Sequence, residues 1–286
     1  MIAHVAAASE ARGRVLLWLD PDVQVSRKAL EAAVHVAAAY AADIETVVMD
    51  GPTLGDVDDI PHAHVSHLGK GLGRHAGGAV IDFRERLAER QRRSVDWLAK
   101  QAGVAVTHTS APGDPIDLLA ELCLVRGPWN MVALGRLPGG ELAPAVSAIL
   151  ANVSGATGVI CAGQRDAPAS DDVAVIVEDM DRMPSMLRAA ERLAMASGQI
   201  HVAIAAETAG AYREIEAQLR LFAADGSRIV FLPGGPNFGV AGAFDAALFR
   251  LRPCFVITRF AGAQPGDARA LTRLAALSAG PLLLVR

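Results

Sequence analysis

The chain alternates short apolar runs with longer stretches in which apolar residues recur every three to four positions. The first run, residues 14–20, is apolar enough to form a strand that is buried on both faces. It is followed by residues 26–42, in which Leu30, Val34 and Ala37 have the spacing of one helical face, with Ser26 as the expected N-cap. Strands that alternate with helices predict a parallel sheet covered on both sides.

The same periodicities predict five strands in each half of the chain. In the first half the expected strands are residues 14–20, 44–50, 104–110, 129–135 and 158–163. The expected helices between them cover residues 26–42, 80–103, 115–123 and 144–153, and Asp114 is the expected N-cap of the third. In the second half the expected strands are residues 173–179, 200–206, 228–232, 254–260 and 281–286.

A polar, proline-containing stretch at residues 164–172 separates the two sets of strands. The order of elements then restarts, and a repeat of this kind indicates two copies of one structural unit. We therefore predict two related α/β domains, at residues 1–165 and 166–286.

Composition narrows the class of protein further. The 286 residues are 52% hydrophobic and 20% charged, which favours large cores over disorder. No apolar run reaches the roughly 18–20 residues that a membrane-spanning helix needs. Charge follows the short apolar N-terminus, whereas a signal peptide carries its charge first. These features predict a cytoplasmic protein with no membrane partner.

The charged residues give no sign of a nucleic-acid partner. The net charge is −4, and binding to nucleic acid requires a basic patch or stripe. The arginine-rich stretch 84–97 carries glutamate four residues before arginine, as in Glu89 and Arg93, which is typical of a solvated helix face. The three cysteines lie far apart in apolar surroundings and are expected to be buried, inert thiols.

Several features in this order resemble a known family. A strand ends in Asp20, a "GDP" turn opens the third helix, and the fourth strand ends in "ALG" before a glycine-containing loop. The whole chain resembles a tandem universal stress protein. The resemblance implies two flavodoxin-like, five-stranded parallel sheets with strand order 3-2-1-4-5 and helices on both faces. Members commonly dimerise through the last strand, so a tandem chain would form a pseudo-two-fold pair within itself; a further homodimer is an open alternative.

The resemblance also implies a nucleotide site. Nucleotide-binding members carry G-x-x-G, nine residues and then G-[S/T] directly after the fourth strand. Gly135 takes the first glycine position, but Pro138 takes the second, where it removes a backbone donor and fixes φ. The positions implied to contact a nucleotide are Asp20, Val48 through its backbone, Gly135, Gly139, Gly140 and Ser147. Ser147 takes the distal position only in a shortened loop, so the phosphate half of the site is degenerate.

The second half departs further from the motif. Arg259 takes the place of Gly135, and no G-x-x-G follows it. Glu178 or Asp179 lies where Asp20 lies in the first half. We expect the second domain not to bind nucleotide.

A histidine-rich stretch precedes the long charged helix. His62, His64 and His67 lie within residues 61–78, and alternate residues of an extended segment point the same way. A two-imidazole metal clamp is the alternative to a polar loop that merely collects histidines. Because spacing fixes no carboxylate or cysteine beside them, we predict no metal site.

These observations predict a stress-response or regulatory binding module with a degenerate nucleotide site, and no enzymatic activity. No cofactor is required, and the expected small-molecule partner is ATP or AMP. One alternative is a working ATP or AMP site in the first domain alone. Another is a slow nucleotide hydrolase.

Overall fold

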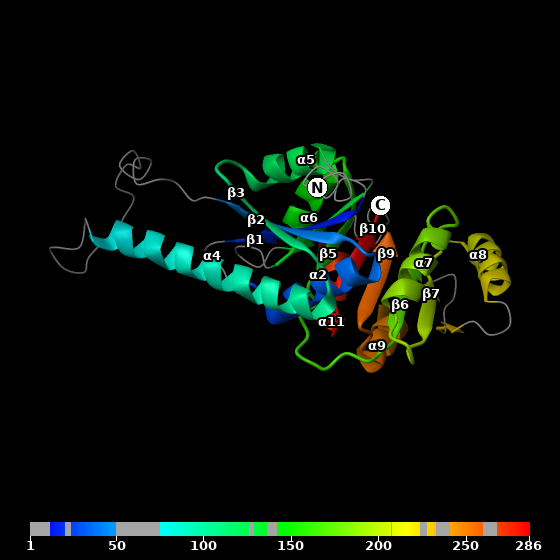
Figure 1. The fold of residues 1–286 in the computed structure, drawn as a ribbon. Helices are drawn as coiled ribbons and strands as arrows, with labels where there is room; N and C mark the ends of the chain where they lie inside the picture. Colours follow the sequence, from blue (N-terminus) through cyan, green and yellow to red (C-terminus); the bar gives the residue numbers. More distant parts are fainter. Residues whose placement is uncertain are drawn as a thin grey trace, which may run out of the picture.

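The computed structural model describes residues 12–20, 24–49, 75–125, 129–135, 142–206, 208–223, 228–232, 241–259 and 268–286. Within these residues helices pack on both faces of one twisted sheet (Figure 1). The first five strands are β1 (Arg14–Leu19), β2 (Asp43–Met49), β3 (Val106–Ala111), β4 (Asn130–Leu134) and β5 (Ala156–Cys161). The other five are β6 (Val173–Val177), β7 (Ile200–Ile204), β8 (Ile229–Phe231), β9 (Phe255–Arg259) and β10 (Leu282–Val285).

The helices alternate with these strands along the chain. In the first half they are α2 (Arg27–Ala39), α4 (His75–Ala102), α5 (Pro115–Val125) and α6 (Leu142–Asn152). In the second half they are α7 (Met183–Leu193), α8 (Ala209–Phe222), α9 (Ala241–Leu251) and α11 (Ala268–Leu277). The predicted α/β class is therefore confirmed.

The strand order is β3-β2-β1-β4-β5-β10-β9-β6-β7-β8. Each half follows the predicted order 3-2-1-4-5, counted from β1 in the first half and from β6 in the second. The resemblance implies two five-stranded sheets that pair within the chain through their last strands, and the structure joins them into one ten-stranded sheet through an antiparallel β5–β10 pair. The other neighbours are parallel. The strands of the two halves consequently run in opposite directions, and their carboxyl ends lie at opposite edges of the sheet.

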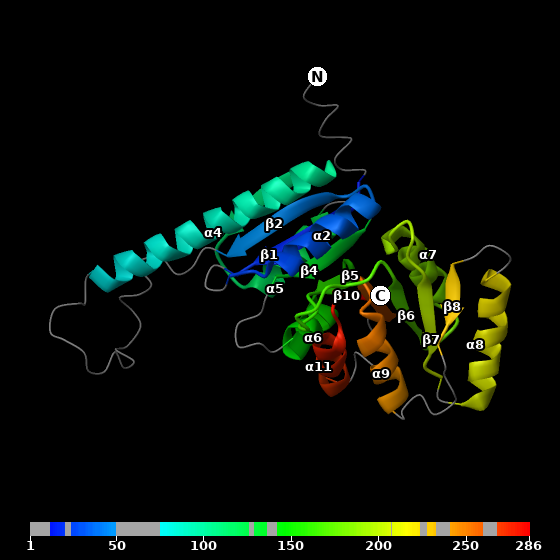
Figure 2. The same ribbon diagram turned by 90° about the horizontal axis from the view of Figure 1, so that it is seen from below.

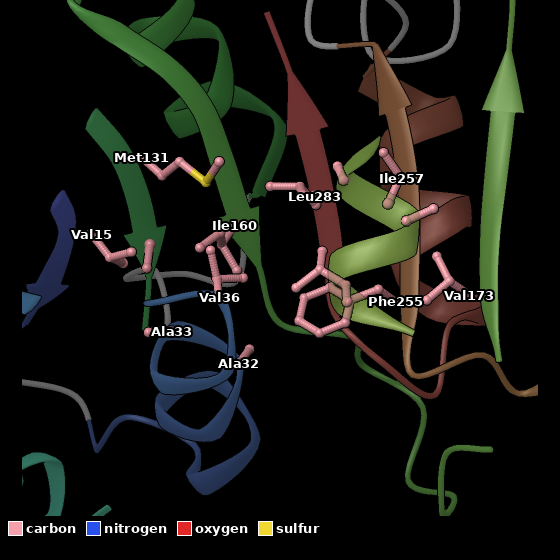
Figure 3. Close-up of a cluster of buried hydrophobic side chains, with 14 of the residues drawn as sticks. Val15, Ala32, Ala33, Val36, Met131, Ile160, Val173, Phe255, Ile257 and Leu283 are labelled. Atoms are coloured by element: carbon pink, nitrogen blue, oxygen red, sulfur yellow. The ribbon is translucent and has the colours of Figure 1, made fainter. Parts of the chain in front are cut away.

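Alternation along the strands divides the apolar side chains between two cores. Val15, Leu17 and Leu19 belong to the core under α2, α4, α7 and α8, whereas Leu16 faces the core under α5, α6, α9 and α11. Figure 3 shows the first core crossing the junction, where Val36 and Ile160 from the first half lie beside Phe255 from the second. Burial on both faces explains why these strands read as continuous apolar runs in the sequence.

Local capping explains where several helices begin. Ser26 accepts a hydrogen bond from the Ala29 amide at 3.2 Å, as predicted for the N-cap of α2. Asp114 accepts from the Ile116 amide at 2.7 Å, which places Pro115 at the first position of α5. The predicted start of the long charged helix is wrong: α4 begins at His75, about a turn and a half before the expected residue 80. The glycines before residue 80 obscured this start, because glycine is a poor helix former.

A buried ionic network ties four strands together at the edge opposite the carboxyl end of β1. Arg14 donates to Glu45 on β2, to the Leu122 carbonyl at 2.6 Å and to the Asn130 side chain at 3.1 Å. Thr109 on β3 donates to the second oxygen of Glu45 at 2.7 Å. Because each charge has a partner and further hydrogen bonds, the network can remain buried. It fixes the relative position of β1, β2, β3 and β4.

The antiparallel junction requires close backbone approach. A Cβ atom at Gly158 on β5 would lie 2.7 Å from the carbonyl oxygen of Leu284 on β10. The C-terminal Arg286 closes the same junction, because its guanidinium donates to carbonyl oxygens of the first half at Leu150, Val153, Ser154 and Ala156. The two halves are thus held by strand pairing, by a shared core and by this arginine.

We expect Gly158→Ala to destabilise the protein by about 1–3 kcal/mol, because the added methyl group must push β5 and β10 apart. Urea denaturation followed by circular dichroism measures the change. Gly210→Ala is the matched control: its Cβ would meet nothing closer than Thr208 at 3.9 Å, and it lies in α8. That control should be neutral or stabilising by up to about 1 kcal/mol. Equal loss in both variants would contradict the importance of the junction.

Candidate functional site

Two of the predicted site residues lie at the carboxyl ends of neighbouring strands. Asp20 directly follows β1 and is buried, and Gly135 directly follows β4. The parallel register pairs Trp18 with Leu134, so these two strand ends lie side by side. The order of the sheet reverses between β1 and β4, and ligands of open α/β sheets bind at such a point.

A cavity of about 650 Å³ lies at this edge. Its walls come from the end of β4, the first turn of α2, the start of α6 and the segment after β5. The lining residues are Ser26, Arg27, Lys28, Leu134, Gly135, Leu142, Ala162, Gly163, Gln164 and Asp166. The volume falls in the range of small-molecule sites, roughly 300–1,000 Å³.

The structure brings some of the predicted nucleotide residues together and separates others. Gly135 lines the cavity, whereas Asp20 follows the neighbouring strand β1 and is not among the lining residues. Val48 is buried within β2 and contributes its side chain to the first core. Ser147 is exposed within α6 and is not among the lining residues. The remaining predicted positions, Gly139, Gly140, His62, His64 and His67, lie outside the described residues.

Packing alone accounts for the glycine at position 135. A Cβ atom there would lie 2.7 and 2.8 Å from the two methyl groups of Val25 and 3.0 Å from the Trp18 carbonyl oxygen. Val25 precedes α2, so the glycine lets the start of this helix approach β4. Gly135 is therefore explained by the fold itself, and its presence is not independent evidence of a phosphate.

The first turn of α2 brings positive charge to the cavity. Arg27 donates to Glu31 at 2.7 Å, and Lys28 donates to the Arg165 carbonyl at 3.0 Å. Lys28 also lies 3.4 Å from the carboxylate of Asp166. Cations at a helix N-terminus oppose the helix dipole. An anion in the cavity would offset that repulsion, and the exposed N–H groups of the turn would favour the anion too.

The corresponding edge of the second half is occupied by an ion pair. Arg259, the last residue of β9, donates to Asp179, which follows β6 by two residues. The other oxygen of Asp179 accepts from the amides of Asp181 at 3.0 Å and Arg182 at 3.3 Å. The chain's own arginine and carboxylate therefore bridge the ends of β9 and β6, which correspond to the ends of β4 and β1 in the first half.

A second polar arrangement carries groups used in catalysis, but its hydroxyl group is buried while His108 and Asp96 are exposed. Thr46 and His108 Nδ1 are 2.7 Å apart, and His108 Nε2 lies 3.1 Å from Asp96. The Thr46 hydroxyl cannot meet a substrate, because this residue is 0% exposed. The arrangement fastens α4 to β2 and β3.

Among the residues that the structure describes, no group of three or more histidine, cysteine, aspartate or glutamate side chains could hold a metal ion. No helix among them is both long and apolar enough to cross a membrane.

Sequence reasoning did not include Arg27, Lys28, Gln164 and Asp166 among the site residues. A signal for the first two was present, since adjacent cations directly follow the N-cap Ser26, where acidic residues are usual. Nothing in the sequence indicated that the segment after β5 returns to the first turn of α2. That proximity is a product of the tertiary fold.

Comparison with known proteins supports the fold. A universal stress protein from Archaeoglobus fulgidus DSM 4304 superposes with a TM-score of 0.57 at 12% identity, covering 95% of this chain and 96% of that one. A protein from Pseudomonas aeruginosa UCBPP-PA14, assigned to the universal stress proteins, gives 0.53 at 14% identity, with 97% and 94% covered. No family model matches the sequence, and no curated protein does.

The same fold occurs in another setting. The cytoplasmic domain of a prokaryotic cation chloride cotransporter gives a TM-score of 0.54 at 10% identity, covering 96% of this chain and 95% of that one. At these identities the comparisons define the class of structure: this chain has the fold of universal stress proteins. A fold shared by a stress protein and a transporter domain leaves function to the site.

The cysteines lead to a prediction about reactivity. Burial raises the pKa of Cys123 and Cys254 to about 11 and that of Cys161 to about 12. At pH 8 only about one Cys123 thiol in a thousand is then the reactive thiolate. We expect Ellman's reagent to label the native protein very slowly at pH 8 and all three cysteines in guanidinium chloride. Rapid labelling of the native protein would contradict this burial.

Proposed function

We propose that the protein is a regulatory binding module of the universal stress protein type, with one adenine nucleotide site, in its first half. The observation that carries the proposal is the cavity at the carboxyl ends of β4 and β5; the buried Asp20 follows the neighbouring strand β1 at the same edge of the sheet. It lies at the reversal of strand order, where this class of sheet binds ligands. We also propose that the protein is located in the cytoplasm and takes part in a stress response.

Asp20 is the proposed adenosine contact. A carboxylate accepts hydrogen bonds from ribose hydroxyl groups, and the backbone near Val48 supplies further polar groups at the end of the next strand. Both positions correspond to those that contact adenosine in nucleotide-binding members of the family. Arg27 and Lys28 supply positive charge for one phosphate at the opposite wall.

The proposed site lacks contacts that nucleotide-binding members of the family make with a triphosphate. Pro138 removes a backbone donor at the second glycine position of the family motif. Ser147 is exposed within α6, away from the cavity lining, and so offers its hydroxyl group elsewhere. We therefore propose that AMP and ATP bind with similar affinity, because the outer phosphates gain few contacts.

The second half does not bind nucleotide in this proposal. The ion pair between Arg259 and Asp179 lies at the strand ends that a nucleotide would need. The first half would then bind the ligand, and the second half would complete the sheet. We propose no enzymatic role: the carboxylates at this edge, Asp20 and Asp166, are assigned to binding.

Calorimetry with AMP, ADP and ATP, with and without Mg²⁺, tests the proposal. We expect AMP and ATP to bind within about fivefold of each other, and Asp20→Asn to weaken both by about tenfold or more, the effect of losing a hydrogen bond to a charged group. Asp179→Asn is the matched control in the second half and should leave binding unchanged.

Other outcomes of the same experiment would contradict the proposal. ATP binding that is far tighter than AMP binding would indicate an intact phosphate loop. Turnover of saturating ATP in the presence of Mg²⁺ would indicate a hydrolase. No heat with any nucleotide would remove the nucleotide from the proposal.

A further inference from the structure

A second cavity lies between α2 and α4, and Arg27 in the first turn of α2 lines both this cavity and the one at the ends of β4 and β5. Its volume is about 560 Å³, and it follows the flank of α4 where this helix runs beside α2 (Figure 2). The lining residues are Gln24, Val25, Arg27, Leu30, Arg86, Glu89, Arg90, Arg93, Ser94, Trp97 and Leu98. The proposed nucleotide function does not use this cavity.

One end of the cavity is apolar and aromatic. Leu30 from α2 and Leu98 from α4 lie beside Trp97, whose exposed fraction is 57%. Phe83 on the same helix is also 57% exposed, and its spacing from Arg86, Arg90 and Trp97 places the four on one helical stripe. Large exposed aromatic groups beside a hollow are typical of binding surfaces.

The other end of the cavity is cationic. Arg86 and Arg90 lie at this end, whereas Arg93 lies one helical turn from Trp97. The single glutamate of the lining, Glu89, accepts from Arg93 at 2.8 Å. Arg27 is likewise paired with Glu31. Among the side chains that the structure describes, which on α4 begin at Phe83, none forms an ion pair with Arg86 or Arg90. Arginine side chains bind carboxylate, sulfonate and phosphate oxygens through two N–H groups at once.

The spacing along α4 separates the cationic end from the aromatic end. Arg86 and Arg90 precede Trp97 by two to three helical turns, about 10–16 Å along the axis at a rise of roughly 1.5 Å per residue. A compact anion that is held by Arg86 and Arg90 does not reach Trp97. A ligand that uses the whole cavity therefore has an anionic head and an extended apolar body.

We propose that the cavity between α2 and α4 binds an elongated amphipathic anion, with its head on Arg86 and Arg90 and its apolar body against Trp97, Leu30 and Leu98. A solvated helix face would explain the arginines alone. It would not explain an apolar hollow with a half-exposed tryptophan two to three turns further along the same stripe. Charge complementarity and length together define the ligand class.

Fluorescence titration with 1-anilinonaphthalene-8-sulfonate tests the proposal, because this dye combines a sulfonate with an aromatic body. We expect saturable binding by the folded protein that decanoate displaces and decyltrimethylammonium does not. Arg86→Ala combined with Arg90→Ala should weaken dye binding by about tenfold, and so should Trp97→Ala. Glu89→Gln should tighten it, because it removes the one negative charge of the lining.

Matched variants separate this site from general dye binding and from the nucleotide site. Arg220→Ala removes an exposed arginine of α8 that lies over the ring of Phe231 in β8, and it should leave dye binding unchanged. Asp20→Asn should also leave it unchanged, and Trp97→Ala should leave AMP binding unchanged. Circular dichroism confirms that each variant is folded.

Three results would overturn the proposal. One is dye binding that is insensitive to both the arginine and the tryptophan variants. Another is displacement by the cationic surfactant as readily as by decanoate. The third is displacement by inorganic phosphate alone, which would show that the arginines form a simple anion site without the apolar end.

Discussion

The close approach of β5 and β10 holds this molecule together. Two units that each have their own strand order become one ten-stranded sheet only because the last strands of both pair in antiparallel fashion. Gly158 leaves no side chain in the way of the Leu284 carbonyl, and Arg286 binds carbonyl groups of the first half. Both apolar cores then continue across the junction, so burial in one half depends on the other.

This pairing also determines where ligands can bind. Because the two halves run in opposite directions, their carboxyl ends face opposite edges of the sheet, and one ligand cannot be shared between them. The two edges have diverged: a cavity with Gly135 at one, and a salt bridge between Arg259 and Asp179 at the other. The two halves therefore share a fold but not a site, because Arg259 at a strand end pairs with the chain's own carboxylate at Asp179.

Much of the architecture could be predicted from the sequence. Helix starts at Ser26 and Asp114 follow from local capping, and buried strands follow from apolar runs, because both depend on neighbouring residues. The start of α4 at His75 was missed because glycine weakens the local signal for a helix. Of the candidate site, Gly135 and Asp20 could be placed at strand ends. The lining by Lys28, Gln164 and Asp166 could not, because it depends on segments far apart in the chain.

The sequence by itself determined the alternation of elements, the repeat and the absence of a glycine at position 259, since these are properties of local order and composition. Only the tertiary structure decided the register of the β5–β10 pair, in which Leu283 lies opposite Ile160. The tertiary structure also explains Gly135, because Val25 packs closely against it. It places a cavity between α2 and α4 that Arg86 and Trp97 line. The reason is physical: periodicity fixes which face of an element is buried, but the space left between two elements depends on how closely their backbones approach.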